Sequence, residues 1–357
     1  MNKYKTAIIC LSRVNGGMEL ASVKLARLLS NDVDIQFIAR DKSYILEKEE
    51  HFKNFPIKVH SVNFSSNLSI SLITQTRKIL IDNKIKNIIF LGASEMKSLY
   101  FATLGLDINF IIRQGSKKTT SKKDLFHKLF YSNVNCFMGN CEYMKQNIID
   151  ILPISKKAKV GRIYSSLKLE QNIKIKPLNE IIDLVHVGRI HPGKGQKSAL
   201  EACQVLYENN FDFKMTFLGD FQNASYYEEI QKDLQKLPYK NNIEFVGYTS
   251  KVKEYLQKSD IFIFPSLGEG MSNAIIESLG FGLIPIIYND TSSPEFKDLG
   301  FHIHLTKENT IKDLKQILLN VANNFKKEKE KAQSNQEKAL NIFAPEREKR
   351  EYLKLLK

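Results

Sequence analysis

Short apolar runs alternate with amphipathic segments along most of this chain of 357 residues. In the first half the apolar runs lie at 5–12, 33–39, 86–93 and 108–115, with helix-like segments at 13–31 and 69–83. In the second half the runs lie at 181–190, 214–220, 242–248 and 260–266, with helix-like segments at 195–210, 225–237 and 251–259. Apolar strands separated by helices are typical of parallel sheets covered on both faces. The pattern therefore predicts an α/β fold of two doubly wound domains.

The domain boundaries follow from where this alternation stops. We predict a first domain over 1–165, a polar linker over 166–180 and a second domain over 181–340. The highly charged segment 323–357 is expected to form two helices broken at Pro345, with its charges on a solvated face. Its last part, 341–357, is expected to pack back on the first domain.

The positive charge is concentrated in the first domain. Residues 1–165 carry 26 Lys and Arg against 13 Asp and Glu, whereas the remainder carries 27 against 26, which gives the net charge of +14. This imbalance predicts an acidic partner for the first half, such as a phosphorylated lipid, an anionic membrane surface or nucleic acid. No apolar run approaches the ~20 residues of a membrane span or forms a signal peptide, so we expect a cytoplasmic protein.

Neither cysteines nor histidines show the spacing of a metal site. The four cysteines form no zinc pattern, and a disulfide between Cys136 and Cys141 is not expected in a cytoplasmic chain. The run Asp32-Val33-Asp34 resembles a metal-binding D-x-D but is interpreted as a turn between a helix and a strand. The seven histidines are expected to form no cluster. The sequence thus predicts no metal.

The stretch "VHVGRIHPGKGQKSAL" (185–200) predicts a phosphate site. It follows a strand and opens a helix, and it places Arg189 and Lys194 beside free helix N–H groups and flexible glycines. A P-loop is the less favoured alternative, because Gly195 stands where Ser or Thr should hold magnesium. A plain strand–turn–helix junction with surface cations is the other alternative.

The stretch "PSLGEGMSNAIIESLGFGLIPIIY" (265–288) predicts a second anion site at a helix start. Ser272 or Asn273 can cap this helix, and both stretches lie where ligands bind open parallel sheets. Glu269 and Glu277 would repel a phosphate, so they are better suited to accepting hydrogen bonds from neutral hydroxyls. Taken singly, each glutamate could equally be a solvated turn or helix residue.

Two features of the first half are weaker signals. Gly16 and Gly17 open a helix and would permit close approach of a ligand to the backbone. The segment 113–131 interleaves apolar residues with cations, which suits an anionic acceptor or a membrane surface, although a solvated basic loop is an equal alternative. The candidate cations are Arg113, Lys117, Lys118, Lys122 and Lys123, next to Gln114.

The chain resembles the retaining glycosyltransferases of family 4, also called glycosyl transferases group 1, which have the GT-B fold. The hallmark E-x7-E of that family corresponds to Glu269 and Glu277, and its G-R-x4-K-G signature to Gly188, Arg189, Lys194 and Gly195. The run "EGMSNAIIESLGFGLIPI" is most similar to members that build bacterial surface polysaccharides and lipid-linked glycans.

The resemblance implies two Rossmann-like domains facing across a cleft, a nucleotide-diphospho-sugar donor (UDP-sugar favoured), and neither metal nor cofactor. Arg189 and Lys194 would neutralise the diphosphate, Glu277 would hold the ribose, and Glu269 the donor sugar. The remaining implied donor contacts are the amides of Met271, Ser272 and Asn273, the glycines Gly16 and Gly17, and a base pocket at Gly219, Val246 and Tyr248.

One feature departs from the family. Many relatives carry His-Gly at the end of a strand in the first domain, near the reacting sugar. Here the best match is Gln114-Gly115, preceded by Arg113. The resemblance therefore gives no active-site histidine, and it leaves the chemistry on the acceptor side open.

The function expected from the sequence is metal-independent, retaining transfer of a hexosyl-type sugar to a glycan or lipid-linked acceptor, as in surface polysaccharide or lipopolysaccharide synthesis. Peripheral association with the inner face of the cytoplasmic membrane is a further expectation. A basic nucleic-acid-binding protein is an alternative, but no nucleic-acid motif or stacking platform is found. A sugar-nucleotide epimerase or a phosphorylase of similar fold is another alternative.

Overall fold

The computed structural model of the chain describes residues 4–14, 16–92, 94–167, 169, 173 and 176–356. The chain divides into two compact units, unit 1 with residues 1–165 and 345–357, and unit 2 with residues 166–344. The predicted linker 166–180 falls at the start of unit 2, and its residues 168, 170–172 and 174–175 lie outside the described residues.

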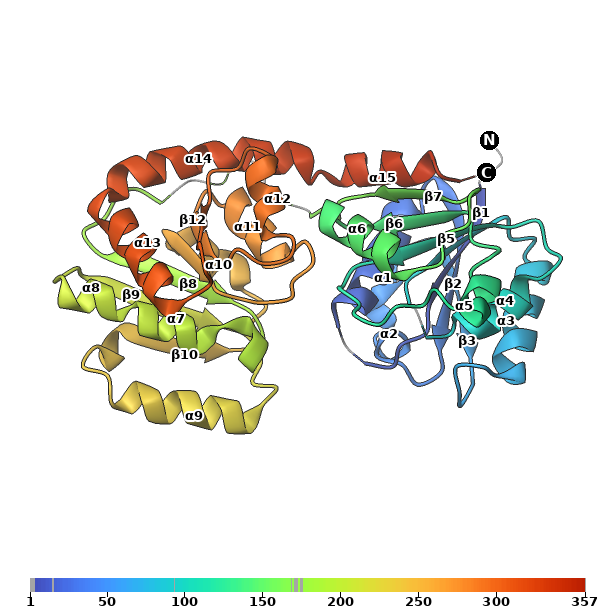
Figure 1. The fold of residues 1–357 in the computed structure, drawn as a ribbon, viewed down its shortest axis with the longest axis horizontal. Helices are drawn as coiled ribbons and strands as arrows, with labels where there is room; N and C mark the ends of the chain where they lie inside the picture. The colour runs from blue at the N-terminus through green and yellow to red at the C-terminus, as the bar shows by residue number, and fades with distance from the viewer. Residues whose placement is uncertain are drawn as a thin grey trace. The chain divides into compact units, whose positions relative to one another are not determined.

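Unit 1 is built on a parallel sheet with the strand order β3-β2-β1-β4-β5-β6-β7 (Figure 1). Its strands are β1 (Tyr4–Cys10), β2 (Val33–Arg40), β3 (Ile57–Val62), β4 (Asn87–Phe90), β5 (Asn109–Gln114), β6 (Cys136–Gly139) and β7 (Lys159–Arg162). Its helices are α1 (Gly17–Leu29), α2 (Tyr44–Glu47), the 3-10 turn η1 (Glu49–His51), α3 (Ile70–Asp82), α4 (Met96–Thr103), α5 (Leu125–Phe130), α6 (Glu142–Ile151) and α15 (Pro345–Leu353).

Both faces of the inner strands of this sheet are largely buried, whereas the edge strands β3 and β7 are more exposed. Side chains alternate between the two faces of a strand, so neighbours in β1 enter different cores. Ile9 packs in a core with Leu72 of α3, and Ile8 packs in another with Leu25 of α1 and Tyr352 of α15. The last helix is thus part of the core of unit 1, and Arg347 fastens its first turn by donating to the carbonyl of Tyr164 at 2.6 Å.

Unit 2 contains a second parallel sheet with the order β10-β9-β8-β11-β12-β13. Its strands are β8 (Ile182–Val187), β9 (Phe213–Leu218), β10 (Ile243–Gly247), β11 (Ile261–Phe264), β12 (Ile284–Ile287) and β13 (His304–Leu305). Its helices are α7 (Gln196–Ala202), α8 (Gln204–Glu208), α9 (Ala224–Gln235), α10 (Val252–Lys258), α11 (Asn273–Gly280), α12 (Ser293–Asp298), α13 (Ile311–Asn323) and α14 (Phe325–Ile342), with the 3-10 turns η2 (Pro192–Lys194) and η3 (Lys240–Asn242). These two sheets confirm the predicted pair of doubly wound α/β domains.

Two local expectations are wrong. The single helix predicted over 195–210 is interrupted at Cys203, between α7 and α8. The charges of the C-terminal helices do not all face solvent, because Glu328, Lys329 and Glu348 are almost completely buried. Composition alone could not reveal this, because a buried charge is stable only beside a partner that comes from elsewhere in the chain.

The buried partner of Lys329 is Asp260, which directly precedes β11. Asp260 is only 1% exposed and forms ion pairs with Lys329 of α14 and, at 2.5 Å, with Lys176. Its carboxylate also accepts the backbone N–H of Asp183 at 3.0 Å, at the start of the neighbouring strand β8. One carboxylate therefore connects the central strands of unit 2 to α14 and to the segment that enters the unit.

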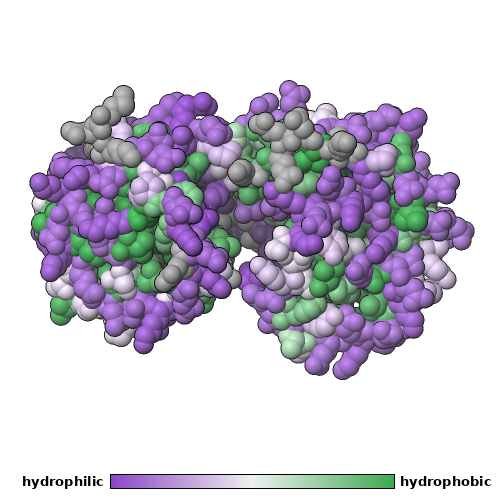
Figure 2. Space-filling model, turned by 180° about the vertical axis from the view of Figure 1, so that it is seen from behind, coloured by the Kyte–Doolittle hydropathy of each residue, from purple (hydrophilic) through white to green (hydrophobic). Residues whose placement is uncertain are grey.

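Figure 2 shows hydrophilic residues over most of the visible face of each unit, with hydrophobic residues in separate patches. Within the described residues, no helix is both long enough and apolar enough to cross a membrane.

We predict that Asp260→Asn destabilises unit 2 by about 3–5 kcal/mol, because the change leaves the buried Lys329 ammonium without its carboxylate. A matched control is Asp233→Asn, which removes an exposed carboxylate paired with Lys197 and should cost less than about 1 kcal/mol. Urea unfolding followed by circular dichroism measures both. Equal losses in the two variants would contradict the assignment of Asp260 as a structural centre.

Candidate active site

The candidate site of unit 2 lies where the connections of its sheet diverge. Strands β8 and β11 are neighbours, but the chain proceeds from β8 to β9 and β10 on one side, and from β11 to β12 and β13 on the other. Ligands of open parallel sheets bind beyond the carboxyl ends of the strands at such a switch point. The two motifs singled out in the sequence, 188–195 and 265–272, are the loops that follow these two strands.

Glycines bring the loops of this edge into backbone contact. Gly195 has φ +75°, and a Cβ at this position would lie 2.0 Å from the carbonyl oxygen of Pro265. Gly219, after β9, has φ +150°, and its Cβ would lie 2.0 Å from the carbonyl oxygen of Gly188. A side chain is therefore excluded at both glycines by sterics as well as by backbone conformation. The glycine motif thus sets how closely the loops after β8, β9 and β11 approach.

Lys194 and Glu269 meet at the centre of this site. The Lys194 ammonium forms a short ion pair with Oε1 of Glu269, and the two side chains are 24% and 18% exposed. Ser266 donates to the same carboxylate oxygen at 2.7 Å and also contacts the carbonyl of Gly193 at 3.1 Å. Two residues 75 positions apart in sequence, both predicted to be catalytic, are thus brought together.

A buried neutral histidine supports the lysine loop. His186 lies between the rings of Phe217 and Phe264, and its Nε2 is 2.8 Å from the carbonyl oxygen of Lys194. Burial lowers the pKa of His186 to about 4, so the ring is neutral at pH 7 and donates its Nε2–H to that carbonyl. His186 therefore fixes the backbone of Lys194 without adding charge to the site.

The loop after β12 holds the glutamate loop from its other side, and the sequence analysis missed it. Asp290 accepts the N–H of Gly268 at 2.6 Å, Thr291 donates to the carbonyl of Glu269, and Ser292 donates to the carbonyl of Gly270 at 2.7 Å. The available signal was position, because "NDTSS" follows an apolar strand of the same sheet and supplies short polar side chains.

The start of α11 offers backbone donors to a ligand. Ser272 stands at the N-cap with φ −71° and ψ 124°, but its side chain makes no capping hydrogen bond. The predicted capping interaction of Ser272 is therefore absent, and Asn273 lies in the helix as its first residue. Met271 and Ser272 are buried and Asn273 is exposed. A helix start without a side-chain cap retains N–H groups that can bind an anion.

Glu277 lies on the same face of α11 as Asn273, four residues further along the helix. It is half-buried, and burial raises the pKa of its carboxyl group, an effect that Lys253 partly offsets. A desolvated carboxylate gains more from a hydroxyl donor than a solvated one, which fits the predicted role as an acceptor of hydroxyl hydrogen bonds.

The other predicted donor-side residues surround this centre. Gly188 donates its N–H to Leu218 at 2.8 Å, and Gly219 donates to Gly247 at 3.0 Å, so the ends of β8, β9 and β10 are linked. Arg189 is exposed and donates from Nη1 to Gln222 at 2.9 Å. Val246 is half-buried and Tyr248 is 79% exposed, which leaves the tyrosine ring available to a base.

Unit 1 has a comparable switch point between β1 and β4. Gly16 is the N-cap of α1 and Gly17 its first residue, with open space where a Cβ of Gly17 would stand. Glu95 follows β4 at the same edge, and burial raises the pKa of its carboxyl group. The sequence analysis did not identify Glu95, because a single glutamate in a polar loop gives no signal without the sheet order.

Arg113 and Gln114, which the sequence assigned to the acceptor or membrane side, are both buried. Arg113 is 7% exposed and donates from Nη2 to Ser165 at 2.5 Å, and Gln114 is 9% exposed and donates to Asn147 at 2.7 Å. Asn147 in turn binds both backbone groups of Lys118 at 2.9 Å. Gln114 thus helps to hold the loop that begins the basic segment, rather than presenting a polar group to solvent.

The basic segment itself is largely exposed. Lys117, Lys118 and Lys123 are exposed, whereas Lys122 is half-buried and points its ammonium at the hydroxyl of Tyr131 at 3.5 Å. Helix α5 follows, and its Leu125 and Phe126 are 79% and 74% exposed. Cations and large apolar side chains therefore share one short stretch of surface.

The expectation that the histidines form no cluster is wrong. His302 and His304 both contact Glu328, with all three donor atoms within 4.8 Å of one another. The spacing H-x-H puts two imidazoles on one side of an extended segment. The glutamate, however, comes from a helix further along the chain, and the sequence did not predict that this helix packs beside the histidines.

The comparisons with known proteins agree with this architecture. Residues 170–339 match the model of the family described as glycosyl transferases group 1. The capsular polysaccharide biosynthesis glycosyltransferase CapH of Staphylococcus aureus is 26% identical over 334 residues, covering 88% of this chain and 93% of CapH. The N-acetylgalactosamine-N,N'-diacetylbacillosaminyl-diphospho-undecaprenol 4-alpha-N-acetylgalactosaminyltransferase of Campylobacter jejuni is 27% identical over 155 residues, covering 42% and 40% of the two chains. HepE of Anabaena, solved in complex with UDP, has a TM-score of 0.82 at 16% identity, covers 98% of both chains and shares the fold.

We predict that Lys194→Ala weakens binding of a nucleoside diphosphate by about 1.5–3 kcal/mol and leaves nucleoside binding nearly unchanged, because only the diphosphate bonds to the ammonium. Lys197→Ala is the matched control, since Lys197 lies three residues further along the chain, in the first turn of α7, but pairs with Glu229 and Asp233. Isothermal calorimetry with UDP and uridine measures both variants. Equal UDP affinity in Lys194→Ala and the parent would exclude this lysine as the diphosphate ligand.

Proposed function

We propose that this chain is a glycosyltransferase that transfers a sugar with retention of anomeric configuration, because its residues 170–339 match the model of the glycosyl transferases group 1 family and its sequence is similar to that of CapH. The donor is a nucleotide-diphospho-sugar. The acceptor is a hydroxyl of a glycan or lipid-linked glycan used in bacterial surface polysaccharide synthesis.

The observation that carries this proposal is the meeting of Lys194, Glu269 and the start of α11 at one switch point. A nucleotide-diphospho-sugar has two negative phosphates between two groups rich in hydroxyls. The site offers the matching chemistry, with a cation and free helix N–H groups for the phosphates and two carboxylates for the hydroxyls. Arg189 adds a second cation on the same loop as Lys194.

The transfer follows from this arrangement. The acceptor oxygen bonds to the anomeric carbon while the bond from that carbon to the diphosphate oxygen breaks, and the diphosphate takes the electron pair. The acceptor hydroxyl proton passes to the leaving phosphate on the same face, which accounts for retention without a protein nucleophile. Lys194, Arg189 and the amides of α11 stabilise the charge that develops on the diphosphate.

This electrostatic stabilisation comes from protein groups, so the proposed transfer needs no metal ion. UDP is the favoured nucleotide. The similarity in fold to HepE, which was crystallised with UDP, supports this choice. The ring of Tyr248 and the linked ends of β9 and β10 would receive the base. The capsular relative CapH and the relative named for a diphospho-undecaprenol acceptor support a surface polysaccharide pathway.

For the acceptor side we propose peripheral association with an anionic membrane surface through residues 117–130 of unit 1. The exposed Lys118 and Lys123 would meet lipid phosphates, and the exposed Leu125 and Phe126 would enter the apolar boundary. Phe130 of the same helix packs against Phe101 of α4 with ring centroids 6.1 Å apart, so α5 is anchored to the unit. Such a surface would bring a lipid-linked acceptor to the enzyme.

The two glutamates should respond differently to removal of their charge. We predict that Glu277→Gln weakens binding of both UDP and UDP-sugar, because both carry the ribose. Glu269→Gln should keep or improve UDP binding, since it also releases Lys194, and should lower the transfer rate about 10-fold or more, equivalent to about 1.4 kcal/mol. Calorimetry and transfer assays measure these quantities. Loss of UDP binding in Glu269→Gln with no effect in Glu277→Gln would reverse the assigned roles and contradict the proposal.

Charge reversal in the basic segment tests the membrane surface. We predict that Lys118→Glu with Lys123→Glu lowers sedimentation with phosphatidylglycerol vesicles by about tenfold or more, because each basic group near such a surface contributes about 1 kcal/mol. The control is Lys156→Glu with Lys157→Glu, which makes the same charge change at two other exposed positions of unit 1. UDP binding should be unchanged in both. Equal sedimentation of the two double variants would assign the segment to a solvated loop.

A further inference from the structure

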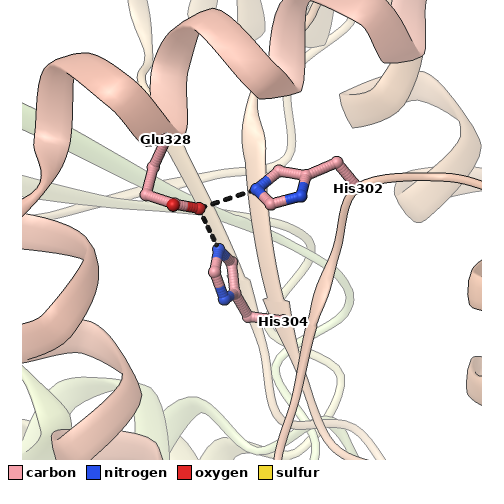
Figure 3. A group of neighbouring side chains, drawn as sticks. All are labelled: His302, His304 and Glu328. Carbon is pink, nitrogen blue, oxygen red and sulfur yellow. Dashed lines mark hydrogen bonds and ion pairs between the residues drawn. The ribbon is translucent and has the colours of Figure 1, made fainter.

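Two histidines and a glutamate form a compact cluster in unit 2, on residues that the proposed transfer does not use. Oε2 of Glu328 lies 2.7 Å from Nε2 of His302 and 2.9 Å from Nε2 of His304 (Figure 3). The figure shows both rings turned edge-on toward the same carboxylate oxygen. All three donor atoms lie within 4.8 Å of one another. Among the described residues, this is the only such group of three His, Cys, Asp or Glu side chains that could hold a metal ion.

The cluster is held by two regular elements. His304 begins β13 and is paired with Ile286 of β12, and His302 precedes it by two residues, which directs both side chains to one side of the extended segment. Glu328 lies on α14, where Asn335 is two turns further along the same helix face. The side chain of Asn335 accepts the N–H of His302 and donates to its carbonyl, both at 2.8 Å. The backbone of His302 is thereby fixed to the helix that carries Glu328.

The carboxylate is also oriented from its second oxygen. Lys331, one turn after Glu328, lies 2.8 Å from Oε1, which leaves Oε2 to both imidazoles. The side chains of His302, His304 and Glu328 are 26%, 24% and 11% exposed. The cluster is therefore ordered by its surroundings and still open to solvent on one side.

We propose that this cluster is a binding site for a divalent transition metal of the zinc class, with His302 Nε2, His304 Nε2 and Glu328 Oε2 as ligands. Two imidazole nitrogens and one carboxylate oxygen are a donor set that zinc uses, with a fourth position left to water. Bonds of about 2.0–2.2 Å place tetrahedral donors roughly 3.3 Å apart, so the rings need to retreat by about half an ångström. In the metal-bound state each neutral imidazole binds through the lone pair of Nε2 and carries its single ring proton on Nδ1.

The metal would act on the stability of unit 2. Its ligands come from the edge strand β13 with its preceding loop and from α14, so only the folded unit assembles them. A ligand that binds only the folded state stabilises it by mass action. None of the three ligands lies in the loops that follow β8, β11 or β12, so sugar transfer should continue when the metal is removed.

The experiment uses the full chain, treated with EDTA and then dialysed. We expect it to bind one equivalent of Zn²⁺ in competition with a chromophoric chelator, and Co²⁺ to give the visible absorption of a four- or five-coordinate ion. Zn²⁺ at 100 times its dissociation constant should raise Tm by about 5–10 °C. A chain that binds neither ion, or whose Tm does not move, overturns the proposal.

Variants identify the ligands. His304→Gln and Glu328→Gln should each lower zinc affinity at least tenfold, as expected when one of three ligands is removed. His60→Gln is the matched control, since it removes a half-buried imidazole of unit 1 whose partner is Gln36 rather than a carboxylate. Equal zinc affinity in His304→Gln and the parent would place the ion elsewhere and refute the site.

Lys331→Ala tests the site by an expected gain of zinc affinity, which misfolding could not produce. Lys331 is 45% exposed, so the variant should fold normally, and removing a positive charge beside the ligand carboxylate should raise zinc affinity roughly threefold. Unchanged or weaker zinc binding in this folded variant would count against coordination by Glu328. Transfer activity that persists in EDTA separates this site from the donor site, and loss of transfer in EDTA would contradict a purely stabilising metal.

Discussion

The contact between Gly195 and the carbonyl of Pro265 is the constraint on which the candidate site depends. A Cβ at Gly195 would stand 2.0 Å from that oxygen, so the loop after β8 can lie against the loop after β11 only if no side chain intervenes. Gly219 plays the same part for the loops after β8 and β9. Once these backbones are in contact, the ion pair between Lys194 and Glu269 and the hydrogen bonds from Ser266 become possible.

The pairing of Lys194 with Glu269 lets the proposed donor site hold two opposite charges at a reduced desolvation cost. Without a ligand, each side chain would otherwise be a partly desolvated charge, and their pairing reduces that cost. In the proposed function, a bound diphosphate would compete for the ammonium of Lys194 and so would release Glu269 toward the sugar hydroxyls. Binding of the phosphates and positioning of the sugar would thereby be linked through one contact. The neutral ring of His186 behind Lys194 fits this scheme, because a second positive charge there would weaken the pairing with Glu269.

How far the sequence predicted the structure depended on whether a feature is local. The strands and the glycine turns could be predicted, because their signals lie within short stretches of consecutive residues and obey known strand and helix-start rules. The roles assigned to the two glutamates of the E-x7-E motif stay predictions. Arg113 and Gln114 could not be placed, because their burial depends on Ser165 and Asn147, which are far away in the chain. The loop at 290–292 and Glu95 were missed for a related reason: only the sheet order shows which loops share an edge.

Helix α14 shows the same limit most clearly. Its sequence is so rich in Lys and Glu that a solvated helix was the natural interpretation, yet two adjacent residues near its start are buried with different partners. Glu328 contacts the two histidines at β13, whereas Lys329 contacts Asp260, which precedes the central strand β11. Neighbouring helix residues point about 100° apart, so one turn of α14 can contact the edge of the sheet and its centre at once. Contacts of this kind add geometric specificity, since a shift of the helix by one residue would take Lys329 away from Asp260 and Glu328 away from the two histidines. The charges of α14 thus fix its register against the sheet of unit 2.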